Sequence, residues 1–109
     1  MKAIYVQPGD TLDYVNTTSS AIDAGTIIIY GARAAVAAAT IPPGETGAIT
    51  LTGAFEVPKA TGEITAGAVV YYDAESDKAT TTAQDNTVIG IAAYAATSSD
   101  ETVIVRLNG

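Results

Sequence analysis

The fold is decided by the stretch Gly47-Ala48-Ile49-Thr50-Leu51-Thr52-Gly53-Ala54-Phe55-Glu56-Val57. Its large apolar residues, Ile49, Leu51, Phe55 and Val57, occupy alternate positions, and polar residues occupy most positions between them. Side chains of a β-strand alternate between two faces, so the pattern predicts a strand with one apolar and one mostly polar face. We expect this strand to bend or bulge at Gly53, because a residue without Cβ lets the backbone turn there.

Parts of this stretch and of the region before it are repeated later in the chain. Residues 45–53 align without gaps on residues 101–109, and residues 24–30 resemble residues 66–72. Both copies read as an Ala-Gly turn, an apolar strand, an Ala-rich strand, a turn and an alternating strand. Such similarity indicates a duplicated structural unit. A β-propensity shared by unrelated strands is the alternative explanation.

The 109 residues are enough for one domain with a single core. We therefore predict one β-domain over residues 1–109, with pseudo-repeat halves at about 24–53 and 66–109 and with residues 1–8 as an N-terminal arm. Much of the apolar content is alanine, so the core is expected to be shallow.

Two segments between the turns need an interpretation of their own. The run Ile27-Ile28-Ile29 predicts a strand covered on both faces, either by the core alone or by the core and an interface. Residues 32–40 are rich in alanine, which favours a helix by propensity. A strand is favoured here, since a glycine precedes the segment and Ile41-Pro42-Pro43-Gly44 closes it.

Frequent turn signals separate short strands along the rest of the chain. This pattern is typical of an all-β fold. The predicted fold is a small β-barrel or sandwich of about nine to ten short strands, with at most one short helix near residues 32–39.

Charge and composition argue against several classes of function. The formal net charge is −7, and the five basic residues are scattered, which argues against binding to nucleic acid. The chain contains neither histidine nor cysteine, so the commonest general base, thiol nucleophiles and most zinc sites are ruled out. We predict that the protein is not an enzyme, with no catalytic residue and no cofactor or metal site.

One acidic segment deserves a comparison with calcium loops. Asp73, Glu75 and Asp77 alternate as at the start of such a loop, but Lys78 replaces the glycine required at the sixth position and Gln84 the glutamate at the twelfth. We interpret the segment as a solvated hairpin tip.

No apolar run approaches the length of about 20 residues that spans a bilayer. The first residues also lack the long apolar core of a signal peptide. These features predict a protein that is made in the cytoplasm and does not enter a membrane.

Several segments together resemble a known family. They are Val6 to Asn16, Ala24-Gly25 with the apolar strand after it, Ile41 to Gly47, Gly53 to Lys59, and Ile89 to Ala92. The combination is similar to the DUF2190 family of small tailed-phage and prophage proteins, which are regarded as capsid cement or decoration proteins. Members are also often labelled RecA/RadA-type phage recombinases. That label is set aside, because the chain has neither a phosphate loop nor a cationic path for DNA.

The resemblance implies a structural virion protein that binds the outside of a tailed-phage capsid and stabilises it. Its implied partner is the major capsid protein, and its implied state is a homo-oligomer, a trimer near local three-fold positions. It implies no cofactor, nucleic acid or membrane partner, and a location on the capsid exterior after synthesis in the host cytoplasm. The candidate interface is the N-terminal segment, expected to add as a strand to the shell or to a neighbouring protomer. It comprises Met1, Lys2, Ala3, Ile4, Tyr5, Val6 and Gln7.

Two alternatives stay open from the sequence alone. One is another phage structural domain, associated with a tail or a fibre. The other is a surface- or carbohydrate-binding module, against which the absence of tryptophan counts. The six tyrosines fit either an interface or a supplement to a small core.

Overall fold

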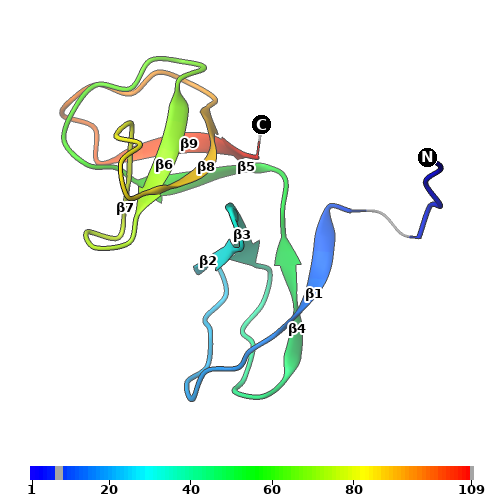
Figure 1. Cartoon of the computed structure of the whole chain (residues 1–109). Coiled ribbons are helices and arrows are strands. Elements are labelled where there is room, and N and C mark those ends of the chain that lie inside the picture. Colours follow the sequence, from blue (N-terminus) through cyan, green and yellow to red (C-terminus); the bar gives the residue numbers. More distant parts are fainter. Residues whose placement is uncertain (7–8, 109) are drawn as a thin grey trace.

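The computed structural model describes residues 1–6 and 9–108, which form two antiparallel sheets and no helix (Figure 1). The four-stranded sheet has the order β1-β4-β3-β2 and the five-stranded sheet the order β5-β9-β8-β6-β7. The strand bounds are β1 (Thr11–Val15), β2 (Ile27–Tyr30), β3 (Arg33–Ala37), β4 (Thr46–Thr50), β5 (Ala54–Pro58), β6 (Val69–Asp73), β7 (Lys78–Thr80), β8 (Thr87–Ala92) and β9 (Thr102–Leu107). The all-β prediction is confirmed. The sheets do not close into a barrel and are consistent with a sandwich.

The stretch that decides the fold is split between the two sheets, so the prediction of one continuous bent strand is wrong. β4 pairs with β1 and β3, whereas β5 pairs with β9. The chain changes sheets through Leu51 to Gly53, where Gly53 has a φ of 113° that glycine adopts readily. The apolar alternation continues through this corner: Ile49 and Val57 are buried, and Leu51 and Phe55 are partly buried.

The alanine-rich segment is strand β3, so the helical alternative for residues 32–39 is excluded. Ala34 and Ala35 are fully buried on opposite faces of the strand. Ala34 packs in the cluster of the five-stranded sheet, and Ala35 in the cluster of its own sheet. Tertiary packing therefore overrides the helix propensity of alanine, because only small side chains let both sheets approach this strand.

Each sheet has its own apolar cluster. Ile28, Ile41 and Ile49 form the centre of the smaller cluster, against the four-stranded sheet. Val70, Ile89 and Val105 belong to the larger one, inside the five-stranded sheet. The Asn108 side-chain amide links the sheets by donating to the carbonyl oxygens of Ala34 (3.1 Å) and Leu51 (2.7 Å).

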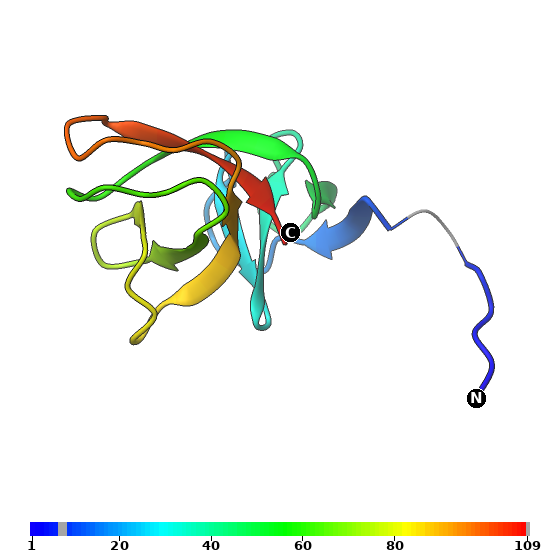
Figure 2. The same ribbon diagram turned by 90° about the horizontal axis from the view of Figure 1, so that it is seen from above.

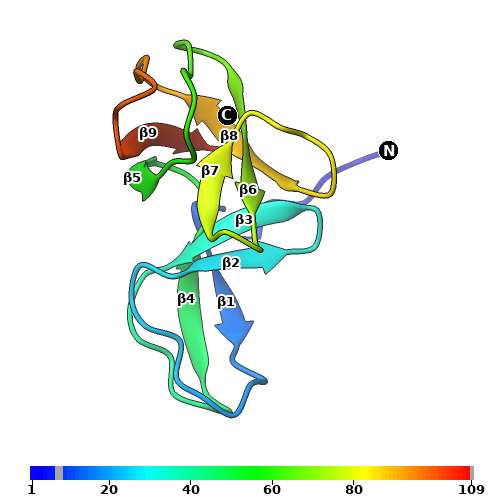
Figure 3. The same ribbon diagram turned by 90° about the vertical axis from the view of Figure 1, so that its left-hand side faces the viewer.

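Most backbone hydrogen bonds of residues 10–51 recur in residues 53–107. The strand order β1-β4-β3-β2 corresponds to β5-β9-β8-β6, and β7 has no counterpart in the smaller sheet (Figure 3). Four of the recurring pairs, each from an N–H to a C=O, are Leu51 to Asp10 and Leu107 to Gly53, Gly25 to Ala37 and Gly67 to Ala92, Ile22 to Ile41 and Ile64 to Ala96, and Ala38 to Ala48 and Ala93 to Ile104.

Candidate interaction surfaces

The segment before β1 extends away from both sheets (Figures 1 and 2). Residues 1–6 belong to no strand, and Ile4, Tyr5 and Val6 are 88%, 80% and 84% exposed. Seven residues were predicted to form an interface, and the structure brings none of the six that it describes against the body of the protein. Gln7 lies outside the described residues. Four large apolar side chains, those of Ile4, Tyr5, Val6 and Met1, are thus presented to solvent on an extended segment.

The body carries further exposed apolar side chains at the ends of strands. Ile29 and Tyr30 are 40% and 43% exposed at the end of β2, and Val15 is 50% exposed at the end of β1. The sequence predicted that both faces of the isoleucine run are covered, by the core alone or by the core and an interface. Ile28 is buried, but Ile29 stays partly exposed in a single copy of the chain. The uninterrupted run of isoleucines is the signal in the sequence for this second apolar surface.

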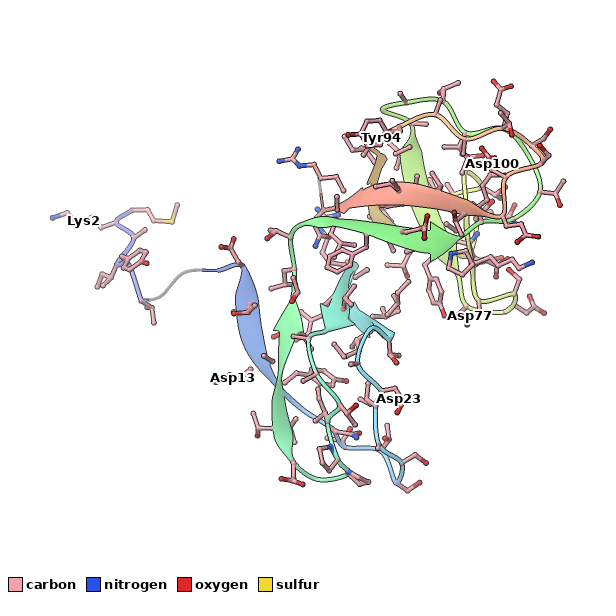
Figure 4. The ribbon with its side chains drawn as sticks, turned by 180° about the vertical axis from the view of Figure 1, so that it is seen from behind. Lys2, Asp13, Asp23, Asp77, Tyr94 and Asp100 are labelled. Atoms are coloured by element: carbon pink, nitrogen blue, oxygen red, sulfur yellow. The ribbon has the colours of Figure 1, made fainter. Side chains whose placement is uncertain are left out.

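Tyr94 is 67% exposed in the turn after β8, near the top of the five-stranded sheet in Figure 4. Tyr14 and Tyr30 form an edge-to-face pair with ring centroids 6.4 Å apart, although β1 and β2 are the opposite edges of their sheet. The four-stranded sheet is therefore strongly curled.

An open groove of about 530 Å³ lies between the two sheets. Ile27, Val36 and Ala37 line it from the smaller sheet, and Phe55 and Val57 line it from β5. The lining is mostly apolar and contains Glu56 as its one ionisable side chain. This arrangement offers no pair of groups for acid–base or nucleophilic chemistry.

Charged groups are distributed without a catalytic cluster among the described residues. Asp13, Asp23, Asp77 and Asp100 are spread over both sheets (Figure 4). The Lys59 side chain is buried, and its Nζ donates a hydrogen bond to the backbone oxygen of Asp100 (3.3 Å). Its partner is a backbone carbonyl in a loop, which indicates a structural role.

The acidic segment of residues 73–78 is the turn between β6 and β7. Asp73 Oδ1 accepts a hydrogen bond from the Glu75 N–H (3.0 Å), and Asp77 Oδ1 accepts one from the Tyr72 hydroxyl (2.5 Å). This hydrogen bond, then burial and the charges of Asp77 and Asp73, raise the pKa of Tyr72 to about 12. Two of the three carboxylates thus hold the hairpin together.

No group of three or more acidic side chains in residues 1–6 and 9–108 is arranged to hold a metal ion. The same residues contain no helix that is long and apolar enough to cross a bilayer.

Comparison with known proteins gives one match. A family model described as phage cement protein matches residues 6–107, which is nearly the whole chain. No protein with curated annotation and no solved structure matches. The match includes both sheets and the corner between them but leaves out most of the N-terminal segment. The chain therefore belongs to the phage cement protein family and has a structural, capsid-stabilising role in the phage particle.

Proposed function

We propose that the protein binds the outside of a tailed-phage capsid as a trimer near local three-fold positions, where each copy bridges neighbouring major capsid subunits. We also propose that it is one of the DUF2190 proteins that it resembles, that it is made in the host cytoplasm, and that it catalyses no reaction.

One observation carries the proposal: an extended segment with four large exposed apolar side chains precedes a body of two thin sheets. Ile4, Tyr5 and Val6 gain little from the rest of their own chain, so their burial requires a partner. An extended segment meets such a partner most directly by adding a strand to an open sheet edge, where backbone hydrogen bonds supply affinity and alternate side chains fill pockets.

The stabilising action follows from many weak contacts. A copy that touches two capsid subunits adds contacts between them, and copies repeated over the shell act together. Internal pressure must then break many such contacts at once, although each is small.

Binding to shells tests the proposal directly. Purified protein is mixed with expanded, undecorated shells, and bound copies are counted by cosedimentation and imaging. Deletion of residues 1–7 should lower the affinity at least tenfold, equivalent to about 1.4 kcal/mol. At a concentration low enough to separate the copies, the melting temperature should change by less than about 2 °C, because the described part of the segment is exposed and not packed on the sheets of its own chain.

The matched control keeps the segment and removes only its apolar contacts, by Ile4→Ser and Val6→Ser. This variant should fall between the intact and the truncated protein. Full binding by the truncated protein would show that the segment is not the attachment point. Density on the inner surface of the shell, or binding to tails in place of shells, would contradict the proposed location.

A further inference from the structure

Strand β7 completes one edge of the five-stranded sheet. It pairs antiparallel with β6, with Tyr71 opposite Thr80 and Asp73 opposite Lys78. Its middle residue, Ala79, is buried in the larger cluster. Beyond β5, the Ala60 N–H donates to the Ala79 carbonyl oxygen (2.8 Å). A strand of three residues thus covers the edge of β6 and reaches the chain that leaves β5.

The corresponding edge of the four-stranded sheet is open. β2 corresponds to β6 and is the last strand in its sheet, so no strand among the described residues takes the place of β7 there. Thr17 corresponds to Ala60, and within residues 1–6 and 9–108 its N–H has no backbone acceptor.

The backbone of β2 is oriented for a further strand. Tyr30 and Arg33 close a two-residue hairpin and form a hydrogen-bonded pair, and such pairs alternate along antiparallel strands. The N–H and C=O of Ile29 therefore point to the open edge, as those of Tyr71 point to β7 in the other sheet.

This edge also lacks the usual protection. Exposed edge strands are commonly blocked by charged residues, proline or a bulge, which prevent pairing with another chain. β2 has the sequence Ile-Ile-Ile-Tyr and contains none of these. Ile29 and Tyr30 remain 40% and 43% exposed there.

We propose that residues 3–6 of a second copy add to β2 as an antiparallel strand, in the place that β7 fills in the other sheet. The inference rests on the proposed function and names the partner of the same N-terminal segment: the β2 edge of a neighbouring protomer. The side chains Ala3, Ile4, Tyr5 and Val6 provide the extended apolar strand, and one of them enters the curled sheet beside Tyr14 and Tyr30, as Ala79 enters the other.

Position along the chain favours a second copy over the same chain. The segment joins β1 at Thr11, whereas the open site lies beyond the other end, next to Thr17. β1 has five residues, which separates the Cα atoms of its two ends by about 13 Å. The segment of the same chain also lies away from the sheets, as Lys2 shows (Figure 4).

Charge is compatible with binding of the segment to the body of another copy. The segment carries Lys2 and no acidic residue. Of the five basic and twelve acidic residues of the chain, the remaining four and all twelve lie from Asp10 onward, giving 4 − 12 = −8. The positive segment therefore meets no like charge of its own sign in excess on the body of another copy, although the net charges of two copies repel at long range.

Cysteine pairing tests the site without background, because the chain has no cysteine of its own. An Ile29→Cys protein is mixed with Tyr5→Cys, and in separate mixtures with Ile4→Cys and Val6→Cys to sample the register. Oxidation in concentrated solution and on decorated shells should link the two variants in at least one mixture. The yield should be several-fold above that with Ser99→Cys, an exposed turn position, in place of Ile29→Cys. Linkage at the control level in both settings, or linkage only within one chain when both cysteines are present, would overturn the proposal.

A proline pair provides the second measurement. Ile29→Pro removes an N–H from the open edge of β2, and Asp13→Pro removes the corresponding outward N–H from β1, the other edge of the same sheet. Ile29→Pro should weaken association between copies at least tenfold, while Asp13→Pro should not. Equal effects would count against the β2 site. Circular dichroism reports whether each variant folds, and the cysteine result decides if one does not.

The two proposals fail in different ways. Shell binding that depends on residues 1–7, without linkage to residue 29, leaves the proposed function intact and refutes the β2 site. Linkage to residue 29 together with full shell binding by the truncated protein would support the β2 site and refute attachment to the shell through residues 1–7.

Discussion

Gly90 on β8 faces the backbone of β9 with no room for a side chain. A Cβ at this position would lie 1.9 Å from the carbonyl oxygen of Arg106 and 3.1 Å from the nitrogen of Asn108. Both neighbours are backbone atoms, so neither moves without disturbing the pairing of β8 with β9.

Gly90→Ala should therefore lower the free energy of unfolding by about 3 kcal/mol or more, at the upper end of the cost of overpacking. Urea unfolding followed by circular dichroism measures the change. Gly9→Ala is the control, because nothing lies within 4 Å of a Cβ there, and it should change stability by less than about 0.5 kcal/mol. Similar midpoints for the two variants would show that the strands separate easily at Gly90.

The hydroxyl of Tyr72 makes stability depend on pH in the alkaline range. The hydrogen bond to Asp77 raises its pKa from 10.0 to about 12, and a raised pKa stabilises the fold only while the group is protonated. The contribution is thus complete below pH 10 and disappears as the pH rises through about 12.

Tyr72→Phe should be less stable than the wild type at neutral pH, and the difference should shrink between pH 10 and 12. Tyrosinate absorbance should lose its last titration step in the same variant. Tyr94→Phe, at a position 67% exposed, is the control and should retain that step. A constant difference in stability across this pH range would contradict the assignment.

At the level of elements, two buried polar side chains stand at equivalent ends of β1 and β5. Asn16 follows β1 and Lys59 follows β5, and both are buried. The Asn16 amide donates to the carbonyl oxygens of Ser20 (2.8 Å) and Ile41 (2.9 Å), and its Oδ1 accepts from the Thr18 N–H (3.0 Å). One side chain therefore fixes the loop between β1 and β2 against the segment before β4.

Asn16→Ala should cost about 2 to 3 kcal/mol, because the variant loses three hydrogen bonds that the buried Asn16 side chain makes. Asn86→Ala is the matched control. The Asn86 amide donates to the Thr82 carbonyl oxygen (2.9 Å) in an exposed turn, so its loss should cost less than about 1 kcal/mol. Thermal unfolding of the two variants compares them, and equal losses would mean that Asn16 does not fix the loop.

On the scale of the whole molecule, the two sheets and the extended first residues make an open shape. The radius of gyration is 14.8 Å, above the roughly 13 Å expected for a compact chain of this size. We propose that the described strands form one domain built from a duplicated four-stranded unit, with β7 as an insertion in the second copy. We propose that thin sheets with many alanines in their cores leave part of the stability to association with partners.

The sequence alone predicted the fold class, and local chemistry explains why. The signals for the fold class depend only on neighbours along the chain. They are the alternation of apolar residues, as in Thr102 to Leu107, and the turn residues at short intervals. The sequence likewise shows by itself that the chain lacks histidine, cysteine and a phosphate loop. The resemblance supplied the capsid role, which the family match supports.

Only the tertiary structure decided how the strands pair. Nothing local shows that Gly53 sends β4 and β5 into different sheets, because pairing depends on partners far along the chain. The pattern of Ala34 to Ala37 fits a helix or a strand, and burial between two sheets selects the strand. The sequence also could not show that the edge of β2 is open, because this edge is recognised only by comparison with β7, which pairs in the other sheet.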